Sequence, residues 1–520
     1  MRRSVGRNLG WALALCCFTR LAAAQPAAQP SASPAPTPAP GTAAPVEAPP
    51  ATPPPPAPEA APTPPPPMPP AEAAPPPPVT AAPTTPAPPP PPSAPMVSKF
   101  SATLYGFVEL DVILDSTQSF NDLAGNAGIA HAGSYAADNK RLTMGARNSR
   151  LGYKLKGPES DMVKTSGMIE ADFLGNQPLG SPAPAGTPPV SESSFFTSPT
   201  FRIRHMLFRM ETPYVDLLVG QYWELFGWQS LFHPATVEIQ GVPGQIYSRA
   251  PQVRLSHAIK TDAVALELAI AASRPPQRDS AVPDGQAGVK LSIPSWKGLH
   301  TGGAAGTAVD GAALGVSGVE RYFRVPNLAA TPTEAIPIHG WGISVDALIP
   351  VIPATDPKSV NALTLTGSFV YGQATADLYT GLTGGASFPS LPNDAMGKPQ
   401  TYPQDIDNGL AVFTADGVLH AIRWESFIVG AQYYFPTSPR LWVAANYSYM
   451  KSSNIDSLLT ATGSNGNKLW DKSWWADGNV FFDANSAVRF GFEYAYFHQN
   501  YLDGTTAKNN RFQLSGFYIF

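Results

Sequence analysis

The chain has 520 residues, of which 14% are charged and 10% aromatic, with 34 Lys and Arg against 38 Asp and Glu. Its longest apolar run beyond the first hundred residues is ten residues from Ala263 and contains Glu267, whereas a membrane-spanning helix needs about 20 apolar residues. The weakly acidic balance argues against nucleic acid as a partner, because phosphate binding needs a basic face. These observations leave a large soluble β protein or a membrane β-barrel.

Residues 1–24 predict a secretory signal peptide. They combine a basic start at Arg2 and Arg3, an apolar stretch and an A-x-A site before Gln25. Both cysteines, Cys16 and Cys17, lie inside this signal. The mature chain therefore holds no disulfide and no thiolate metal site. Without the four signal arginines, the formal charge falls from -4 to -8.

Residues 25–99 predict a disordered Pro/Ala-rich linker. Of the 60 prolines, 33 lie between Pro26 and Pro95, in a stretch that has no aromatic residue and so cannot build a core. Such sequence favours extended polyproline II. Two interpretations remain open: a solvated tail without a partner, or an arm in the periplasm that tethers the protein to the cell wall or a periplasmic partner.

Residues 100–520 predict a transmembrane antiparallel β-barrel. The run SATLYGFVELDVILD alternates apolar residues such as Val108 and Leu110 with acidic ones such as Glu109 and Asp111, over more residues than a soluble strand usually has. Seventeen such runs are present, and two near residue 420 count as one bulged strand, so we expect about 16 strands. Short turns alternate with long Gly/Pro-rich loops, as in outer-membrane barrels.

The last run, RFQLSGFYIF, alternates to the final residue, Phe520. A chain that stops on an aromatic residue of a β-strand resembles the C-terminal signature of bacterial outer-membrane proteins. That resemblance implies that Phe520 belongs to an assembly signal, read by the barrel-assembly machinery. With the signal peptide, it places the barrel in the outer membrane of a Gram-negative bacterium, in contact with its lipid.

The polar face of the strands predicts the lining of a water-filled lumen, whose charges set selectivity. Arg202 and Arg204 point the same way, about 7 Å apart along one strand, a spacing that suits a small dicarboxylate. The alternative is that arginines and acids pair only to keep the interior packed. Strand parity predicts a basic wall of Arg150, Lys154, Lys156, Arg202, Arg204, Arg254, Lys260, Arg489 and Arg511, opposed by an acidic wall of Glu109, Asp111, Glu170, Asp172 and Glu493.

Three segments resemble the DcaP-like porins: LYGFVELD from Leu104, NSRLGYKLKGP from Asn148, and the run from Leu217 that contains GQYWELFGW and RAPQVRLS. The resemblance implies a 16-stranded homotrimeric barrel that passes small anions such as dicarboxylates through a basic constriction. By match to the R-x-PQ-V/I-R motif, it assigns Arg249 and Arg254 to that constriction. The family places a coiled-coil segment before the barrel, and this chain has the Pro-rich stretch instead.

No motif points to a cofactor, a metal or an enzyme. Gly-rich stretches lack the phosphate-loop spacing, the histidines lack zinc-ligand spacing, and no G-x-S-x-G is present. We therefore expect a non-enzymatic porin for passive diffusion of small, preferentially anionic solutes. Two alternatives stay open: a structural outer-membrane anchor whose Pro-rich arm does the work, and a barrel hydrolase.

Overall fold

The computed structural model describes residues 100–520 except 125–127, 176–195, 239–240, 278, 303, 305, 330, 355, 357–360, 381–395, 398–408, 415–416, 439 and 460–469. The signal peptide and the Pro-rich linker of the sequence analysis lie outside the described residues. Within the described part, no helix has the length and apolar character needed to cross a membrane.

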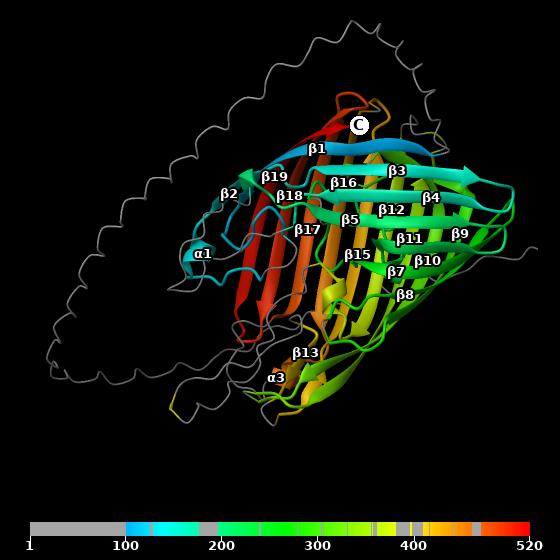
Figure 1. Cartoon of the computed structure of the whole chain (residues 1–520). Coiled ribbons are helices and arrows are strands. Elements are labelled where there is room, and N and C mark those ends of the chain that lie inside the picture. Colours follow the sequence, from blue (N-terminus) through cyan, green and yellow to red (C-terminus); the bar gives the residue numbers. More distant parts are fainter. Residues whose placement is uncertain are drawn as a thin grey trace, which may run out of the picture. The chain divides into compact units, whose positions relative to one another are not determined.

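The described chain is almost entirely β-structure (Figure 1). The helical elements are short: α1 (Tyr135–Asp138), η1 (Phe226–Trp228), η2 (Ala376–Leu378) and α3 (Ile455–Leu459). The strands are β1 (Ser101–Asp115), β2 (Arg141–Gly145), β3 (Arg150–Glu159), β4 (Lys164–Asp172), β5 (Arg202–Glu211), β6 (Asp216–Trp223), β7 (Arg249–Lys260), β8 (Ala265–Ser273), β9 (Asp284–Thr301), β10 (Thr307–Pro326), β11 (Ala335–Ile352), β12 (Ala362–Gln373), β13 (Ala411–Phe413), β14 (Leu419–Ala421), β15 (Arg423–Tyr434), β16 (Leu441–Ser452), β17 (Trp470–Asp483), β18 (Val488–Tyr501) and β19 (Thr506–Ile519).

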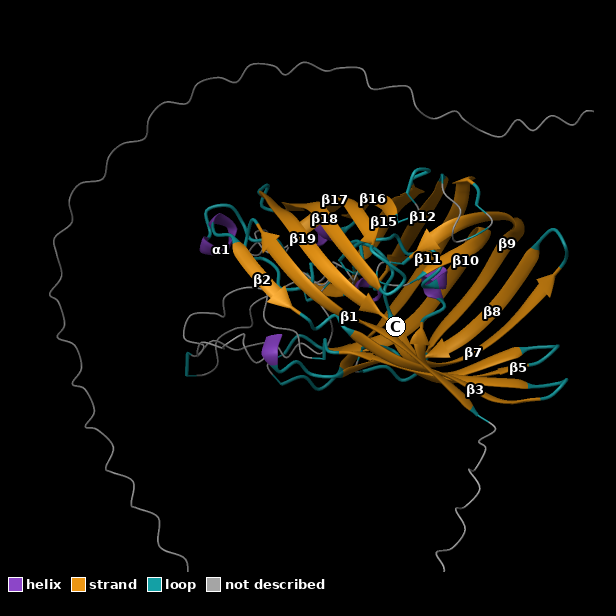
Figure 2. Cartoon of the chain, turned by 90° about the horizontal axis from the view of Figure 1, so that it is seen from above, coloured by secondary structure: helices purple, strands orange, loops and turns teal. Residues whose placement is uncertain are grey.

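The main sheet closes into an antiparallel barrel of 16 strand positions, which confirms the predicted fold. Each strand pairs with the next along the chain, and β19 returns to pair with β1 (Figure 2). The strands β2 and β3 share one position, because β2 pairs with the second half of β1 and β3 with its first half. Only β13 and β14 stand apart, as a two-stranded hairpin between β12 and β15.

The ends of the barrel chain meet at the seam between β1 and β19. The amide of Phe520 donates to the carbonyl of Gly106, and the amide of Gly106 donates back to Phe520, at 3.0 Å each. A continuous ladder from Phe107 to Asp115 follows. The alternation that runs to the last residue of the sequence is therefore the strand that closes the barrel. Its role as an assembly signal stays a prediction.

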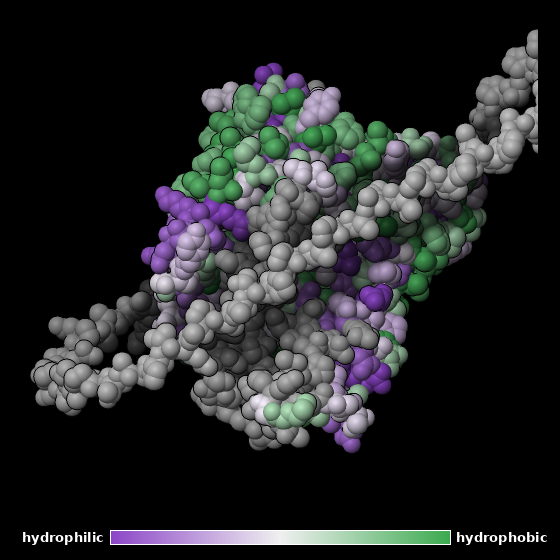
Figure 3. All heavy atoms as spheres, turned by 60° about the vertical axis from the view of Figure 1, so that its left-hand side comes forward, coloured by the Kyte–Doolittle hydropathy of each residue, from purple (hydrophilic) through white to green (hydrophobic). Residues whose placement is uncertain are grey.

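The predicted alternation between the two faces is confirmed along the wall. Val108 and Leu110 on β1 are 55% and 51% exposed, whereas Glu109 and Asp111 between them are buried at 0% and 1%. Hydrophobic side chains gather on the wall in the view of Figure 3. A wall that exposes its apolar side chains and buries its acids is inverted relative to a soluble protein. The low charge content of the sequence follows from this inversion.

The connections mostly alternate in length, as predicted; the exception is a turn of four residues between β18 and β19, at the end opposite the other short turns. Turns of about four to six residues follow β3, β5, β7, β15 and β17, whereas β4, β6 and β12 are followed by segments of more than twenty. Both ends of the barrel chain lie at the end with the short turns, which we call the short-turn end. In outer-membrane barrels this end faces the periplasm.

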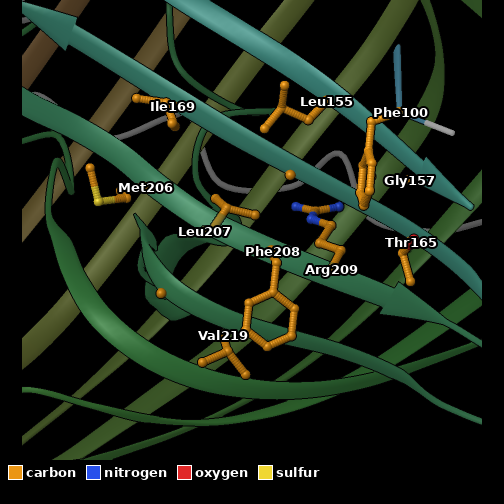
Figure 4. A pocket seen from close by; sticks show the side chains of 13 residues that line it. Phe100, Leu155, Gly157, Thr165, Ile169, Met206, Leu207, Phe208, Arg209 and Val219 are labelled. Atoms are coloured by element: carbon orange, nitrogen blue, oxygen red, sulfur yellow. The ribbon is translucent and has the colours of Figure 1, made fainter. Parts of the chain in front are cut away.

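One apolar recess interrupts the outer wall over β3 to β6 (Figure 4). It has a volume of about 520 Å³ and is lined by outward side chains, among them Phe100, Leu155, Ile169 and Phe208. Arg209 also borders it, although its guanidinium carbon lies 5.0 Å from the ring centre of Tyr222, on the lumen side. The recess therefore belongs to the lipid-facing surface and not to the lumen.

Candidate functional site: the barrel lumen

A long segment between β6 and β7 folds into the barrel, and we call its described residues, 224–238 and 241–248, the inward segment. The amide of Gly227 donates to Ser317 on β10 at 2.8 Å, and that of Val237 donates to Glu493 on β18 at 2.9 Å. The amide of Gly244 then donates to the carbonyl of Thr380, beyond β12, at 2.7 Å. The segment thus reaches the wall far from its own strands before it returns to β7, and it narrows the lumen.

Glycines on the inner wall make room for the inward segment. A Cβ at Gly315 on β10 would lie 2.7 Å from Cδ1 of Trp228, and a Cβ at Gly491 on β18 would lie 2.8 Å from Cγ2 of Val237. Such distances do not occur between real atoms, so a larger residue would displace the segment. Glycine inside a strand commonly marks a close backbone approach. Three more inner-wall glycines lie against side chains of the inward segment, namely Gly288, Gly342 and Gly430.

Four arginines gather where β3, β5 and β7 face the lumen, and we call Arg150, Arg202, Arg204 and Arg249 the arginine cluster. Nε of Arg204 donates to Glu170 at 2.8 Å, and Nη2 of Arg202 donates to Asp172 at 2.6 Å. Nη1 of Arg204 also reaches Asp172, at 3.1 Å. The structure thus brings the predicted Arg202 and Arg204 together on one carboxylate.

The carboxylates of this region do not form an opposite wall, as we had expected for Glu170 and Asp172. They lie on β4, between the two arginine-bearing strands β3 and β5. The register places Asp172 directly between Arg150 and Arg202. Neighbouring strands lie only about 4.8 Å apart, so each acid contacts its arginines instead of facing them across the lumen.

A β-bulge in β5 turns two consecutive side chains into the lumen. The register shifts so that Glu170 pairs with His205 while Ala171 pairs with Ile203, which leaves Arg204 as the extra residue. The side-chain amide of Gln221 donates to the carbonyls of Ile203 and Arg204, at 2.9 and 3.2 Å. The bulge thereby adds a buried histidine beside Arg204, a use of bulges that is common near functional sites.

Arg249 differs from the other members of the arginine cluster. Its guanidinium carbon lies 5.0 Å from the ring centre of Trp223 and 5.5 Å from that of Tyr247. Among the described residues, no ion pair joins it to a carboxylate. Burial opposes ionisation of Tyr247, but Arg204, Arg249 and Arg150 outweigh it and lower the pKa of its hydroxyl below the usual value. A lowered pKa of a buried hydroxyl indicates a positive electrostatic potential at that hydroxyl.

The cluster continues into aromatic and imidazole rings of the inward segment. His233 packs edge-on against Trp223 at 5.3 Å and stacks on Tyr247 at 5.6 Å. Burial lowers the pKa of His233 to about 3, and His300 and nearby arginines act in the same direction. A neutral His233 therefore adds no charge to the site at neutral pH. None of Trp223, His233 and Tyr247 was among the residues assigned to the constriction from the sequence.

The remaining predicted cations are not members of the cluster, although Arg254 binds Trp223, whose ring lies under Arg204 and Arg249. Lys154 stacks over Tyr105 at 4.8 Å, and Arg254 donates to the carbonyl of Trp223 at 2.6 Å. Arg489 pairs with Asp483 at 2.5 Å. Arg511 on β19 is fully buried against Asp115 at 2.9 Å. The last two are held in pairs several strands away from β5, so they do not join the arginine cluster.

The other predicted acids lie under the tip of the inward segment. Asp111 accepts from Asn148 at 2.6 Å and from Gln513 at 3.1 Å, and Glu109 is buried two residues away on the same strand. Glu238 of the inward segment faces them, and burial together with Glu493 and Asp111 raises its pKa well above the usual value, against the opposing effect of Arg511. Glu493 is the predicted acid that contacts the inward segment, because it accepts the amides of Val237 and Glu238.

No group of three or more His, Cys, Asp or Glu side chains in the described ranges is arranged to hold a metal ion. A 16-stranded closed barrel with an apolar outer wall and charged groups inside has the architecture of transmembrane β-barrels.

Solved structures share this fold. The outer-membrane channel DcaP of Acinetobacter baumannii matches with a TM-score of 0.55 and 18% identity, over 81% of this chain and 97% of that chain. This confirms, at the level of the fold, the resemblance seen in the sequence. An anion-selective porin from Comamonas acidovorans matches with a TM-score of 0.45 and 10% identity, over 81% of this chain and all (100%) of that one.

OmpT of Vibrio cholerae, an outer-membrane protein, matches with a TM-score of 0.44 and 11% identity, over 82% of this chain and 100% of that one. No family model and no curated protein matches the sequence.

Proposed function

We propose that the protein is an outer-membrane porin through which small, preferentially anionic solutes diffuse passively, without catalysis. One observation carries the proposal: two cations of the arginine cluster are more accessible than the acids that accompany them, although Arg204 is buried with those acids at 3%. The side chains of Arg202 and Arg150 are 31% and 19% exposed, whereas those of Glu170 and Asp172 are 9% and 1% exposed. A solute in the lumen therefore meets guanidinium groups first.

The charge count of the cluster supports the same sign of selectivity. Four guanidinium groups accompany two carboxylates, and Arg249 is positioned by Trp223 and Tyr247 instead of by an acid. An anion about 4 Å from one guanidinium gains about 1 kcal/mol at the dielectric constant of bulk water and more beside the protein wall. Such energies are large enough to favour anions over cations and small enough for a bound anion to leave again, and passive conduction requires both.

We further propose that the short-turn end faces the periplasm and that the Pro-rich arm extends there, because β1 begins at that end. A homotrimer is proposed from the resemblance to DcaP-like porins alone. Native mass spectrometry of detergent-extracted protein tests the trimer. Protease accessibility of residues 25–99 in intact and permeabilised cells tests the side of the arm.

The anion preference is tested in planar lipid bilayers. Purified protein should give stepwise conductance, and in a tenfold KCl gradient its reversal potential should have the sign of chloride preference. Arg249→Gln should move that potential toward zero, because it removes one cation that no described carboxylate neutralises. A closed barrel, or a potential with the sign of potassium preference, would refute the proposed function.

A further inference from the structure

Three further cations face the lumen in one row across the barrel wall. The register aligns Lys156 on β3 with Ser166, Ser166 with Arg209 on β5, Arg209 with Leu218, and Leu218 with Arg254 on β7. Every second strand thus contributes one cation, with main-chain positions about 10 Å apart. We call Lys156, Arg209 and Arg254 the mouth row.

The mouth row lies nearer the short-turn end than the arginine cluster does. Arg209 follows Arg204 by five residues on β5, and Arg254 follows Arg249 by five on β7. Both strands run toward the short-turn end, and five residues of strand span about 17 Å. Their main-chain positions are therefore successive along this wall, and the side chain of Arg254 reaches back to the carbonyl of Trp223 at 2.6 Å.

The two groups differ in how their charge is compensated. In the arginine cluster, β4 places Glu170 and Asp172 between the arginines, whereas in the mouth row the intervening positions are the neutral Ser166 and Leu218. None of the three mouth-row cations forms an ion pair with a carboxylate in the parts of the chain that the structure describes. Two acids act on Arg254, and both have other partners: Glu267 on β8 is bound to Lys290 at 2.7 Å, and Glu224 accepts from Ser273 at 3.0 Å.

Neutral groups hold the mouth-row guanidinium groups in place. Arg254 donates to the backbone carbonyl of Trp223 at 2.6 Å and to the side-chain oxygen of Gln252 at 3.1 Å. The guanidinium of Arg209 lies over the ring of Tyr222. Carbonyl, amide and ring partners fix the orientation of a guanidinium without cancelling its charge.

We propose that the mouth row is a second anion station and that it determines charge selectivity more strongly than the compensated arginine cluster does. This inference rests on the proposed function, anion permeation. A unit charge about 6 Å from a passing ion in water changes the local concentration of that ion about threefold. Three uncompensated charges act together, reduced by salt screening at 0.1 M, so their removal should lower the anion-to-cation permeability ratio about tenfold.

The test compares two sets of variants in planar bilayers at 0.1 M mean salt. Lys156→Gln/Arg209→Gln/Arg254→Gln should lower the permeability ratio about tenfold, and Arg150→Gln/Arg249→Gln about twofold. Lys164→Gln, an exposed cation at the turn after β3, is the control and should change it by less than twofold. Circular dichroism and heat-modified gel mobility establish that each variant forms a barrel.

The outcomes separate this inference from the function on which it rests. A wild-type channel without anion preference refutes the proposed function and the inference together. An anion-preferring wild type whose triple variant keeps its ratio, or loses less of it than the Arg150/Arg249 variant, refutes the mouth row alone. If the triple variant does not fold, Arg209→Lys and Arg254→Lys, which keep the charge, should fold and retain the ratio, and loss of the ratio in them overturns the inference.

Discussion

Glu493 anchors the tip of the inward segment, and replacing it should release that tip. Its Oε2 accepts the amides of Val237 and Glu238 at 2.9 Å each, inside a fully buried site. In Glu493→Ala, the amide of Val237 keeps Asn479 at 2.9 Å, whereas that of Glu238 loses its acceptor. Leaving the one buried amide of Glu238 without an acceptor costs about 1–3 kcal/mol. That loss shifts the balance between the bound and the released tip by about fivefold or more.

The expected result in planar bilayers is a larger and noisier single-channel conductance for Glu493→Ala. Gln499→Ala is the matched control on the same strand, because Gln499 holds the amide of Ile129, at 2.8 Å, and not the inward segment. A disulfide between Val237→Cys and Gly491→Cys should restore the small conductance, since the sequence has no cysteine after Cys17. The reasoning is wrong if the conductance of Glu493→Ala is unchanged. It is also wrong if the variant with the added disulfide keeps a noisy conductance.

Three further results are expected. Gly315→Val should displace Trp228 and alter conductance, because its Cβ would lie 2.7 Å from that ring, whereas Gly318→Val on the same strand meets only ordinary contacts and should not. The pKa of His233 is lowered to about 3, so on acidification this histidine is protonated in the unfolded chain before it is protonated in the folded one. The free energy of unfolding should therefore fall between about pH 6.5 and pH 3, by up to about 1.4 kcal/mol per pH unit. In urea titrations followed by gel mobility, His233→Gln should reduce this dependence on pH. The raised pKa of Glu238 has the opposite sign, so stability should fall as the pH rises above about 4.3, and Glu238→Gln should remove that loss in the same titration.

The barrel could be predicted from the sequence because its two faces meet different solvents. Lipid outside and polar groups inside impose a period of two on every strand, as Val108, Glu109 and Leu110 show. The interruption between β2 and β3 could not be predicted in this way. There the chain leaves the ladder at residues 146–149, and Arg147 turns to Asp122 at 3.1 Å. An ion pair between a buried wall residue and a loop residue produces no periodic pattern in the sequence.

The cations of the site could be placed on the correct face from parity, but their partners could not. Parity says that Arg204 and Glu170 both point inward, and it does not say which strands are neighbours. The turn of four residues between β3 and β4 was the available signal. A turn that short pairs β4 with β3 and so sets Asp172 beside Arg150. The inward segment gave weaker signals, namely inner-wall glycines such as Gly315, whose meaning depends on what packs against them.

The acids of the arginine cluster have a structural consequence for the pore. Two guanidinium groups about 5 Å apart repel each other by about 3 kcal/mol at the effective dielectric constant of a protein surface, so several could not converge on one wall alone. Glu170 and Asp172 offset that repulsion and, being buried behind Arg202 and Arg150, add little to the potential that a solute meets. The acids thereby compensate the arginines from buried positions, while Arg202 and Arg150 remain partly exposed to the solute. The mouth row has no such acids between its strands; its main-chain positions lie about 10 Å apart, and neutral partners such as Trp223 and Tyr222 hold its arginines.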